Sequence, residues 1–125
     1  MNIRKCAIIG CGNVGATTAY TLMQSGLFSE MVLIDIDMKR AQGEAEDIAH
    51  GLPFHSPMNI YAGSYSDLSD AALIIITAGA AQHPGETRID LVHRNVRVFS
   101  SIVDGITVSL IHISEPTRLR CISYA

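Results

Sequence analysis

Two short segments of this chain carry residue types that can act on a phosphate-bearing cofactor and on a small acid. The first is a glycine turn at residues 10–15, with the sequence GCGNVG. The second is a polar loop at residues 79–88, GAAQHPGETR, which carries one arginine, Arg88, and one neutral amide, Gln82. Backbone N–H groups at a glycine turn bind phosphates, and a guanidinium stabilises negative charge developing on an oxygen. The two segments predict a cofactor site beside a site that stabilises negative charge on an oxygen.

The glycine turn lies between a short apolar run, residues 5–9, and a helical pattern over residues 13–25. This is the setting that a dinucleotide site requires. Gly10 permits the tight turn, Gly12 lets the backbone approach a pyrophosphate, and Gly15 allows close helix–strand packing. The helix N-terminus adds unpaired N–H groups and partial positive charge. The alternative is that these glycines only shape a turn.

Asp35 ends a second buried run, residues 31–35, and lies 20 residues beyond Gly15. An acid at this position accepts hydrogen bonds from the ribose diol of NAD, whereas it repels the additional phosphate of NADP. We therefore expect NAD as the cofactor, although the nearby Lys39 and Arg40 keep NADP as an alternative. A solvated acid at a strand end is the purely structural alternative.

A third feature is the run of β-branched residues at 72–77, which leads into Gly79 and Ala80. Parallel α/β sheets bind ligands at the carboxyl ends of their strands. Thr77, Gly79 and Ala80 are small, so a cofactor could lie close against the backbone there. An ordinary strand-to-loop turn is the alternative.

The loop that follows carries the candidate substrate residues. The Arg88 guanidinium could stabilise negative charge that develops on a substrate oxygen. The alternative for Arg88 is a solvated side chain at a helix start, where its charge is unfavourable against the helix dipole. Gln82 has the alternative of a plain exposed loop amide.

The elements that position these residues alternate between strands and helices. The strands are expected at residues 5–9, 31–35, 58–62 and 72–77, and the helices at residues 13–25, 39–50 and 88–105. This alternation predicts an α/β fold with a doubly wound parallel sheet. In the last helix we expect an apolar stripe to face the core, at Val92, Val96, Phe99, Val103 and Ile106.

Composition excludes several other classes of protein. At 125 residues, with 48% hydrophobic and 17% charged residues, the chain is expected to form one globular domain. A net charge of -3 argues against a nucleic-acid partner. The three cysteines suit a reducing compartment, and the five histidines show no metal-binding spacing. The longest apolar run, residues 71–81, is too short to span a bilayer. We expect a cytoplasmic protein without a metal or a membrane segment.

Residues 10–15, 33–36, 77–80 and 82–88 carry a family resemblance in their order and spacing. The chain resembles the amino-terminal half of an L-lactate dehydrogenase, within the lactate/malate dehydrogenase superfamily, over about residues 2–106. The resemblance implies a Rossmann-type NAD-binding domain and reversible hydride transfer between NADH and pyruvate, giving (S)-lactate.

The resemblance also implies roles for individual residues. Arg88 would be a catalytic and substrate-binding residue on a loop that closes over the substrate, and Gln82 would bind the substrate. Malate dehydrogenases tend to place an arginine at the latter position, whereas a neutral glutamine suits the methyl side of pyruvate. The cofactor-binding positions so implied are Val14, Asp35, Arg40, Tyr65, Gly79, Ala80 and Ser101.

The last part of the chain departs from the resemblance. We expect residues 1–107 to form the NAD-binding domain and residues 108–125 to be a tail of non-family sequence, arising from read-through or an artefact. Within the tail, residues 108–113 could form a strand. The histidine, aspartate and second arginine that the family uses would lie beyond residue 106.

Without those groups and the substrate domain, we expect this truncated chain to be inactive by itself. Its parent would be a homotetramer that acts on a 2-keto/2-hydroxy acid. A malate dehydrogenase of the same superfamily and a non-catalytic dinucleotide-binding module are the alternatives.

Overall fold

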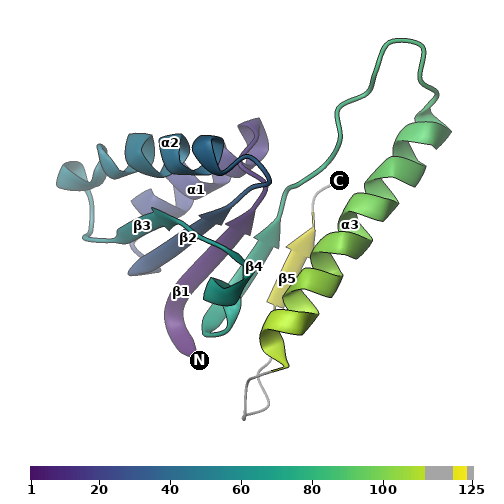
Figure 1. Ribbon diagram of the computed structural model, residues 1–125. Coiled ribbons are helices and arrows are strands. Elements are labelled where there is room, and N and C mark those ends of the chain that lie inside the picture. The colour runs from purple at the N-terminus through teal and green to yellow at the C-terminus, as the bar shows by residue number, and fades with distance from the viewer. Residues whose placement is uncertain (112–119, 124–125) are drawn as a thin grey trace.

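The structure is a computed structural model that describes residues 1–111 and 120–123 (Figure 1). It confirms the expected alternation of strands and helices, and most element bounds lie within one residue of the predicted ones. In chain order the elements are β1 (Asn2–Ile9), α1 (Asn13–Ser25), β2 (Glu30–Ile34), α2 (Met38–Ala49), the 3₁₀ helix η1 (Leu52–Phe54), β3 (Asn59–Ala62), the 3₁₀ helix η2 (Tyr65–Leu68), β4 (Ala71–Ile76), α3 (Arg88–Leu110) and β5 (Arg120–Ser123).

The five strands form one parallel sheet in the order β3-β2-β1-β4-β5. The central strand β1 pairs with β2 on one side and β4 on the other, so that Ile8 lies beside Leu33 and Ile75. Because the strands are parallel, their carboxyl ends meet at one edge of the sheet. The segments that follow β1, β2 and β4 therefore come together at that edge.

Both faces of the sheet are covered by apolar side chains, as a doubly wound fold requires. Alternate residues of β1 point to opposite faces. Cys6 and Ile8 pack in a cluster with residues of α1 and α2, whereas Ala7 and Ile9 pack with residues of η2 and α3. All four side chains are buried, which explains why β1 reads as a continuous apolar run.

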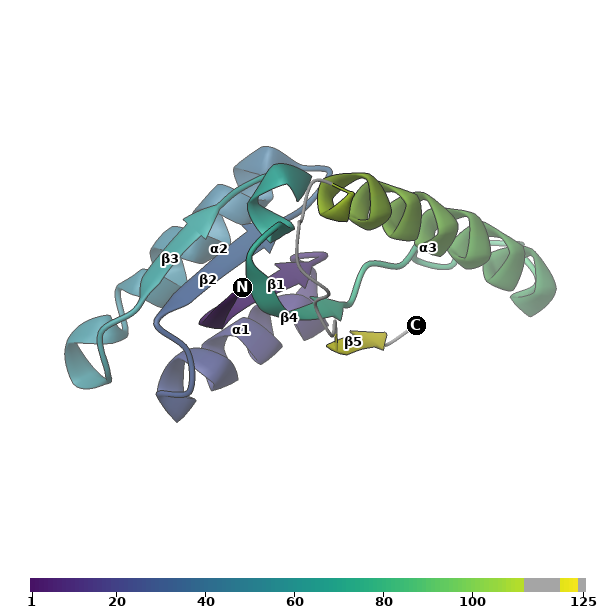
Figure 2. The ribbon, with the colours of Figure 1, turned by 90° about the horizontal axis from the view of Figure 1, so that it is seen from below.

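Helix α3 differs from its predicted form in the face that it buries. Ile102 and Ile106 are buried, but Val92 and Val96 are 58% and 57% exposed, and Phe99 and Val103 are also exposed. The prediction of a core-facing stripe was therefore wrong except at Ile106. The reason is the position of the helix: Figures 1 and 2 show its N-terminal half extending away from the strands of the sheet.

Helix α3 also runs further than predicted. It ends at Leu110 instead of Gly105, so the expected strand is wrong for residues 108–110. Gly105 does not end the helix; a Cβ there would lie 3.2 Å from the Tyr65 ring, so a glycine lets that ring approach. Residues 112–113 of the expected strand, and most of the remaining tail, lie outside the described residues.

A short strand, β5, occurs at residues 120–123 of the tail, beyond the stretch where a strand was expected. It pairs in parallel with β4 and adds a fifth strand to the sheet. No helix in the described part of the chain is long and apolar enough to cross a membrane.

At the end of the strands opposite the glycine turn, a buried lysine of β1 links β2, β3 and the residue that precedes β4. The Nζ atom of Lys5, in β1, lies 2.6 Å from Oδ1 of Asp70 and 3.0 Å from Oε2 of Glu30. The hydroxyl of Tyr61 donates a hydrogen bond to the same Glu30 oxygen. Burial alone lowers the pKa of Lys5, but its bonds to Asp70, Glu30 and Tyr61 raise it overall, so the ammonium stays charged. This network stabilises β1 to β4 far from the glycine turn.

Candidate functional site

The glycine turn has little room for side chains at two of its three glycines. Gly10 has a φ of 99°, and a Cβ there would lie 2.5 Å from the backbone nitrogen of Ala78. A Cβ at Gly15 would collide with the carbonyl oxygen of Gly10 and lie 2.7 Å from Oγ1 of Thr77. These two glycines are therefore required by the local packing of β1, α1 and the end of β4.

Gly12 is different, because a Cβ built on it meets no atom of the described residues within 4 Å. Its backbone is extended, and it precedes the first residue of α1 without a side-chain cap. The first N–H groups of a helix have no partner inside the helix and attract anions. The turn thus presents open space beside uncapped donors, which is the shape that a pyrophosphate fits.

Thr77 holds the turn from the neighbouring strand. Its backbone N–H donates to the carbonyl oxygen of Ile9 at 2.8 Å, and its hydroxyl donates to that of Gly10 at 2.7 Å. The backbone N–H of Gly10 donates in turn to the carbonyl of Ile34 at the end of β2. The turn is fixed by both strands that flank β1.

Asp35 lies directly beside this turn. One carboxylate oxygen accepts a hydrogen bond from the backbone N–H of Cys11 at 2.7 Å, and the other accepts from the N–H of Asp37 at 2.8 Å. The side chain is half-buried, and two backbone donors orient it. The carboxylate is therefore positioned at the turn, although the bond to Cys11 was not foreseen from the sequence.

The thiol of Cys11 fills space beneath the turn. It is buried, with Sγ 3.8 Å from the carbonyl oxygen of Ile34. Burial raises the pKa of this thiol to about 12, and the negative charges of Asp35 and Glu44 act in the same direction. The charge of Arg40 opposes them. At neutral pH the thiol is protonated and behaves as a small apolar group.

The remaining expected cofactor positions lie on several different elements. Val14 is exposed in the first turn of α1, and Arg40 is exposed in the first turn of α2. Tyr65, in η2, packs against α3, and Ser101 is exposed on α3. Gly79 is exposed just after β4, and the N–H of Ala80 donates to Oδ1 of Asn95 at 2.8 Å. The structure brings Gly10, Gly12, Gly15, Asp35 and Thr77 together, and the roles of the other positions stay predictions.

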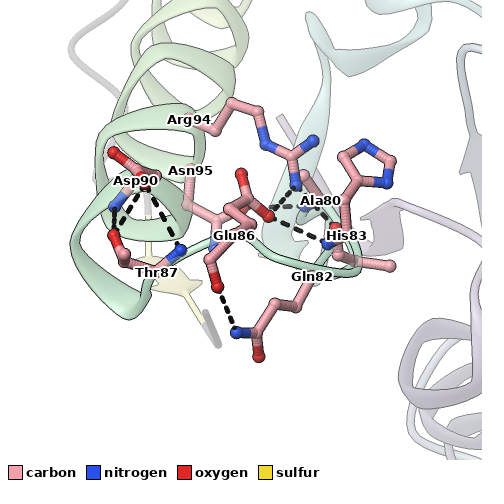
Figure 3. A network of polar contacts seen from close by, with 9 residues as sticks. Ala80, Gln82, His83, Glu86, Thr87, Asp90, Arg94 and Asn95 are labelled. Carbon is pink, nitrogen blue, oxygen red and sulfur yellow. Dashed lines mark hydrogen bonds and ion pairs between the residues drawn. The ribbon is translucent and has the colours of Figure 1, made fainter.

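The polar loop between β4 and α3 is held by a network of hydrogen bonds (Figure 3). The Nε2 atom of Gln82 donates to the carbonyl oxygen of Glu86 at 2.9 Å, and the N–H of His83 donates to the Glu86 carboxylate at 2.9 Å. Gly85 closes this tight turn with a φ of 81°. Gln82 is exposed, but its amide is engaged inside the loop.

Arg88 is the first residue of α3 and is exposed. The helix start is well defined, because Thr87 and Asp90 cap it reciprocally. Hydrogen bonds from Thr87 lower the pKa of Asp90, whose negative charge also offsets the unfavourable position of Arg88. Within the described part of the chain, the Arg88 guanidinium makes no hydrogen bond or ion pair, so it is free to meet a ligand.

Two polar residues of α3 were missed by the sequence reasoning. Arg94 and Asn95 both face the loop and hold its backbone. A signal for them exists, because the helical spacing of Leu91, Val98 and Ile102 places residues 94 and 95 on the inward face. A charged side chain on an inward face requires a partner.

The described residues contain no group of three or more His, Cys, Asp or Glu side chains that could hold a metal ion. A parallel α/β sheet, an uncapped helix after a glycine turn and an acid after the next strand define a dinucleotide-binding domain of the Rossmann type. Residues 4–113 match the NAD binding domain of lactate/malate dehydrogenases. The chain belongs to the lactate/malate dehydrogenase family, and its cofactor class is NAD.

Individual relatives agree with this assignment. The chain is 60% identical over 101 residues to an L-lactate dehydrogenase of Thermoanaerobacter sp. (strain X514), covering 81% of this chain and 32% of the relative. It is 57% identical over 104 residues to that of Acetivibrio thermocellus, covering 83% and 33%. The chain thus spans about a third of the length of the curated relatives it matches.

Solved structures show the same fold. A lactate dehydrogenase from a Medee basin deep-sea metagenome library matches with a TM-score of 0.86 and 41% identity, covering 98% of this chain and 38% of that one. A malate dehydrogenase from Archaeoglobus fulgidus, in complex with NADH, matches with a TM-score of 0.79 and 31% identity, covering 95% and 40%. The domain end at residue 107 stays a prediction; α3 continues through it, and the family match extends to residue 113.

Proposed function

We propose that the whole protein is an NAD-dependent L-lactate dehydrogenase, and that this chain supplies its cofactor-binding part. The reaction is the reversible transfer of a hydride between NADH and pyruvate, giving (S)-lactate. The observation that carries the proposal is the loop that follows β4, which presents the neutral amide of Gln82 and the exposed guanidinium of Arg88, without a partner among the described residues. A domain that only binds a dinucleotide has no evident need for such an arginine.

The residues of the sheet edge hold the cofactor in this proposal. Gly12 and the uncapped N-terminus of α1 receive the pyrophosphate, while Gly10, Gly15 and Thr77 keep the turn in its shape. Asp35 accepts hydrogen bonds from the adenosine ribose, and its charge disfavours NADP. The positions that line the rest of the cofactor are Val14, Arg40, Tyr65, Gly79, Ala80 and Ser101.

The loop residues act on the substrate. NAD supplies the hydride acceptor or donor when it is bound. Arg88 stabilises the negative charge on the keto oxygen, which develops only as the reaction proceeds, so its contribution is to the transition state. Gln82 leaves the carbonyl oxygen of Glu86 and faces the methyl side of pyruvate, where a second carboxylate would lack a cationic partner.

The proposed activity belongs to the whole protein, because the chain spans only about a third of its relatives. The chain alone is proposed to bind NAD without catalysing turnover. The parent is proposed to be a cytoplasmic homotetramer that binds a small 2-keto/2-hydroxy acid. Malate dehydrogenases also match the fold, and the neutral Gln82 is the feature that favours pyruvate over oxaloacetate.

Substrate preference tests this proposal in a full-length chain, in which residues 1–106 replace the matching segment of the Thermoanaerobacter relative. We expect kcat/KM for pyruvate to exceed that for oxaloacetate by at least about 100-fold, because the second carboxylate would be buried without a partner. Steady-state oxidation of NADH, measured for each acid, gives the ratio. A clear preference for oxaloacetate would overturn the assignment to lactate.

A further inference from the structure

The loop and helix α3 are joined by a single guanidinium. Arg94 lies in the second turn of α3, and its Nη2 atom donates to the carbonyl oxygen of Ala81 at 2.6 Å and to Oε2 of Glu86 at 3.1 Å. One nitrogen thus holds both ends of the segment 81–86. Figure 3 shows the guanidinium lying over the loop, between Ala80 and Glu86.

The segment between Ala81 and Glu86 also makes hydrogen bonds within itself. The N–H of Glu86 donates to the carbonyl oxygen of His83 at 3.1 Å, and the Glu86 carboxylate accepts from the N–H of His83 at 2.9 Å. The same carboxylate oxygen accepts from Arg94. The Glu86 side chain is 13% exposed and that of Arg94 is 28% exposed, so water competes for this pair less than at an open surface.

The contact of Arg94 with the loop desolvates another nitrogen of the same guanidinium. The Nε atom of Arg94 is buried and has no hydrogen-bond partner among the described residues. A buried, unpartnered donor is unfavourable. The guanidinium therefore tolerates a desolvated nitrogen while its Nη2 atom bridges the loop. Asn95, the next residue, adds a second anchor through the N–H of Ala80 at 2.8 Å.

We propose that Arg94 is a positioning residue that fixes Gln82 relative to Arg88, and this proposal rests on the function proposed above. Arg88 is held by the capped start of α3, whereas Gln82 belongs to the segment that Arg94 ties to the same helix. The two substrate residues therefore keep one spacing as long as the Arg94–Glu86 pair is intact. When the loop moves, residues 81–86 move together with the N-terminal half of α3.

Amide hydrogen exchange on the 125-residue chain tests the anchor without cofactor or substrate. The reporter is the N–H of His83, whose acceptor is the Glu86 carboxylate. We expect Arg94→Gln and Glu86→Gln each to accelerate its exchange by roughly tenfold or more, because a charge-assisted bond is lost. Arg94→Lys should fall between, since its ammonium keeps the charge but lacks the planar, rigid fork of the guanidinium. Arg97→Gln, which removes the same charge from an exposed site one turn later, is the matched control.

Exchange of the buried amides of β1 serves as the folding control and should be unchanged in all four variants. An acceleration at His83 of less than about twofold in both Arg94→Gln and Glu86→Gln would overturn the proposal. So would an equal acceleration in Arg97→Gln. This measurement remains decisive if the protein proves not to reduce pyruvate, because it does not depend on turnover.

A second readout separates positioning from simple structural support. In the full-length chain, Arg94→Gln should lower the ratio of pyruvate to oxaloacetate kcat/KM by roughly tenfold, while the Kd for NADH stays within about twofold. Arg94→Lys should restore part of that ratio. An unchanged ratio accompanied by a weaker NADH affinity would contradict the proposal, since it would place the effect at the cofactor.

Discussion

The Gly15→Ala variant is expected to lose most of its folded population. The added Cβ would collide with the carbonyl oxygen of Gly10 and lie 2.7 Å from Oγ1 of Thr77. Neither neighbour can retreat easily, because Gly10 is held by the end of β2 and Thr77 by the end of β1. Overpacking a core costs about 1–3 kcal/mol, and a clash with fixed backbone lies at or beyond the upper end. That is a large part of the stability of a small domain.

Gly12→Ala is the matched control for this prediction. Its φ of -76° suits any residue, and the new Cβ meets none of the described atoms within 4 Å. We expect its midpoint of thermal unfolding to stay within a few degrees of the wild type, while its affinity for NADH falls because the methyl group occupies the space of the pyrophosphate. Circular dichroism melts of both variants make the comparison. Equal stability of the two variants would show that Gly15 is not required by packing.

The second large effect is expected for Arg88→Gln in the full-length chain. Glutamine keeps a hydrogen-bond donor but removes the charge that faces the developing oxyanion. Loss of one such group lowers kcat by roughly 10²–10³-fold. Since Arg88 is exposed and makes no contact with the described residues of the glycine turn, the Kd for NADH should change by less than about twofold.

Single-turnover kinetics and NADH fluorescence titrations separate the two quantities for Arg88→Gln. Arg97→Gln, also exposed on α3, removes the same charge and should leave both nearly unchanged. If NADH affinity and turnover fell in equal proportion in Arg88→Gln, the arginine would be serving the cofactor and its proposed role at the keto oxygen would be wrong.

The part of the fold that depends on near neighbours in sequence could be predicted well. The apolar run of β1, the glycine turn and helix α1 are specified by adjacent residues, and the predicted bounds of α1, residues 13–25, are those observed. The acid at Asp35 could be placed beside the turn because parallel strands end at a common edge. Its hydrogen bond to the backbone of Cys11 could not be foreseen.

The predictions that were wrong concern features that depend on contacts between residues far apart in the sequence. Helical spacing predicts a core-facing stripe on α3 that runs from Val92 to Ile106. The position of the helix relative to the sheet buries Ile106 together with Ile102, and it leaves Val92 and Val96 exposed. Gly105 reads as a helix stop, but its small size serves the ring of Tyr65. Such choices are made by tertiary packing, which overrides local propensity.

The hydrogen-bond and ion-pair partners of polar side chains also could not be predicted from the sequence. Arg88 was recognised by its motif, whereas Arg94 belongs to no motif and became visible only through its bonds to Ala81 and Glu86. Lys5 sits in an apolar run and would read as a strand-end residue, yet it is buried between Asp70 and Glu30. A charged residue within an apolar pattern indicates that it has a charged or polar partner. Which residue that partner is can be learned only from the fold.

We propose that this chain forms an NAD site in which Asp35 selects against the additional phosphate of NADP. Titration of the folded 125-residue chain with NADH and with NADPH, followed by calorimetry, tests it most directly. We expect NADH to bind at least about tenfold more tightly than NADPH, because like charges would meet at Asp35. An equal or tighter affinity for NADPH, or no binding of NADH to a chain shown to be folded, would contradict the account.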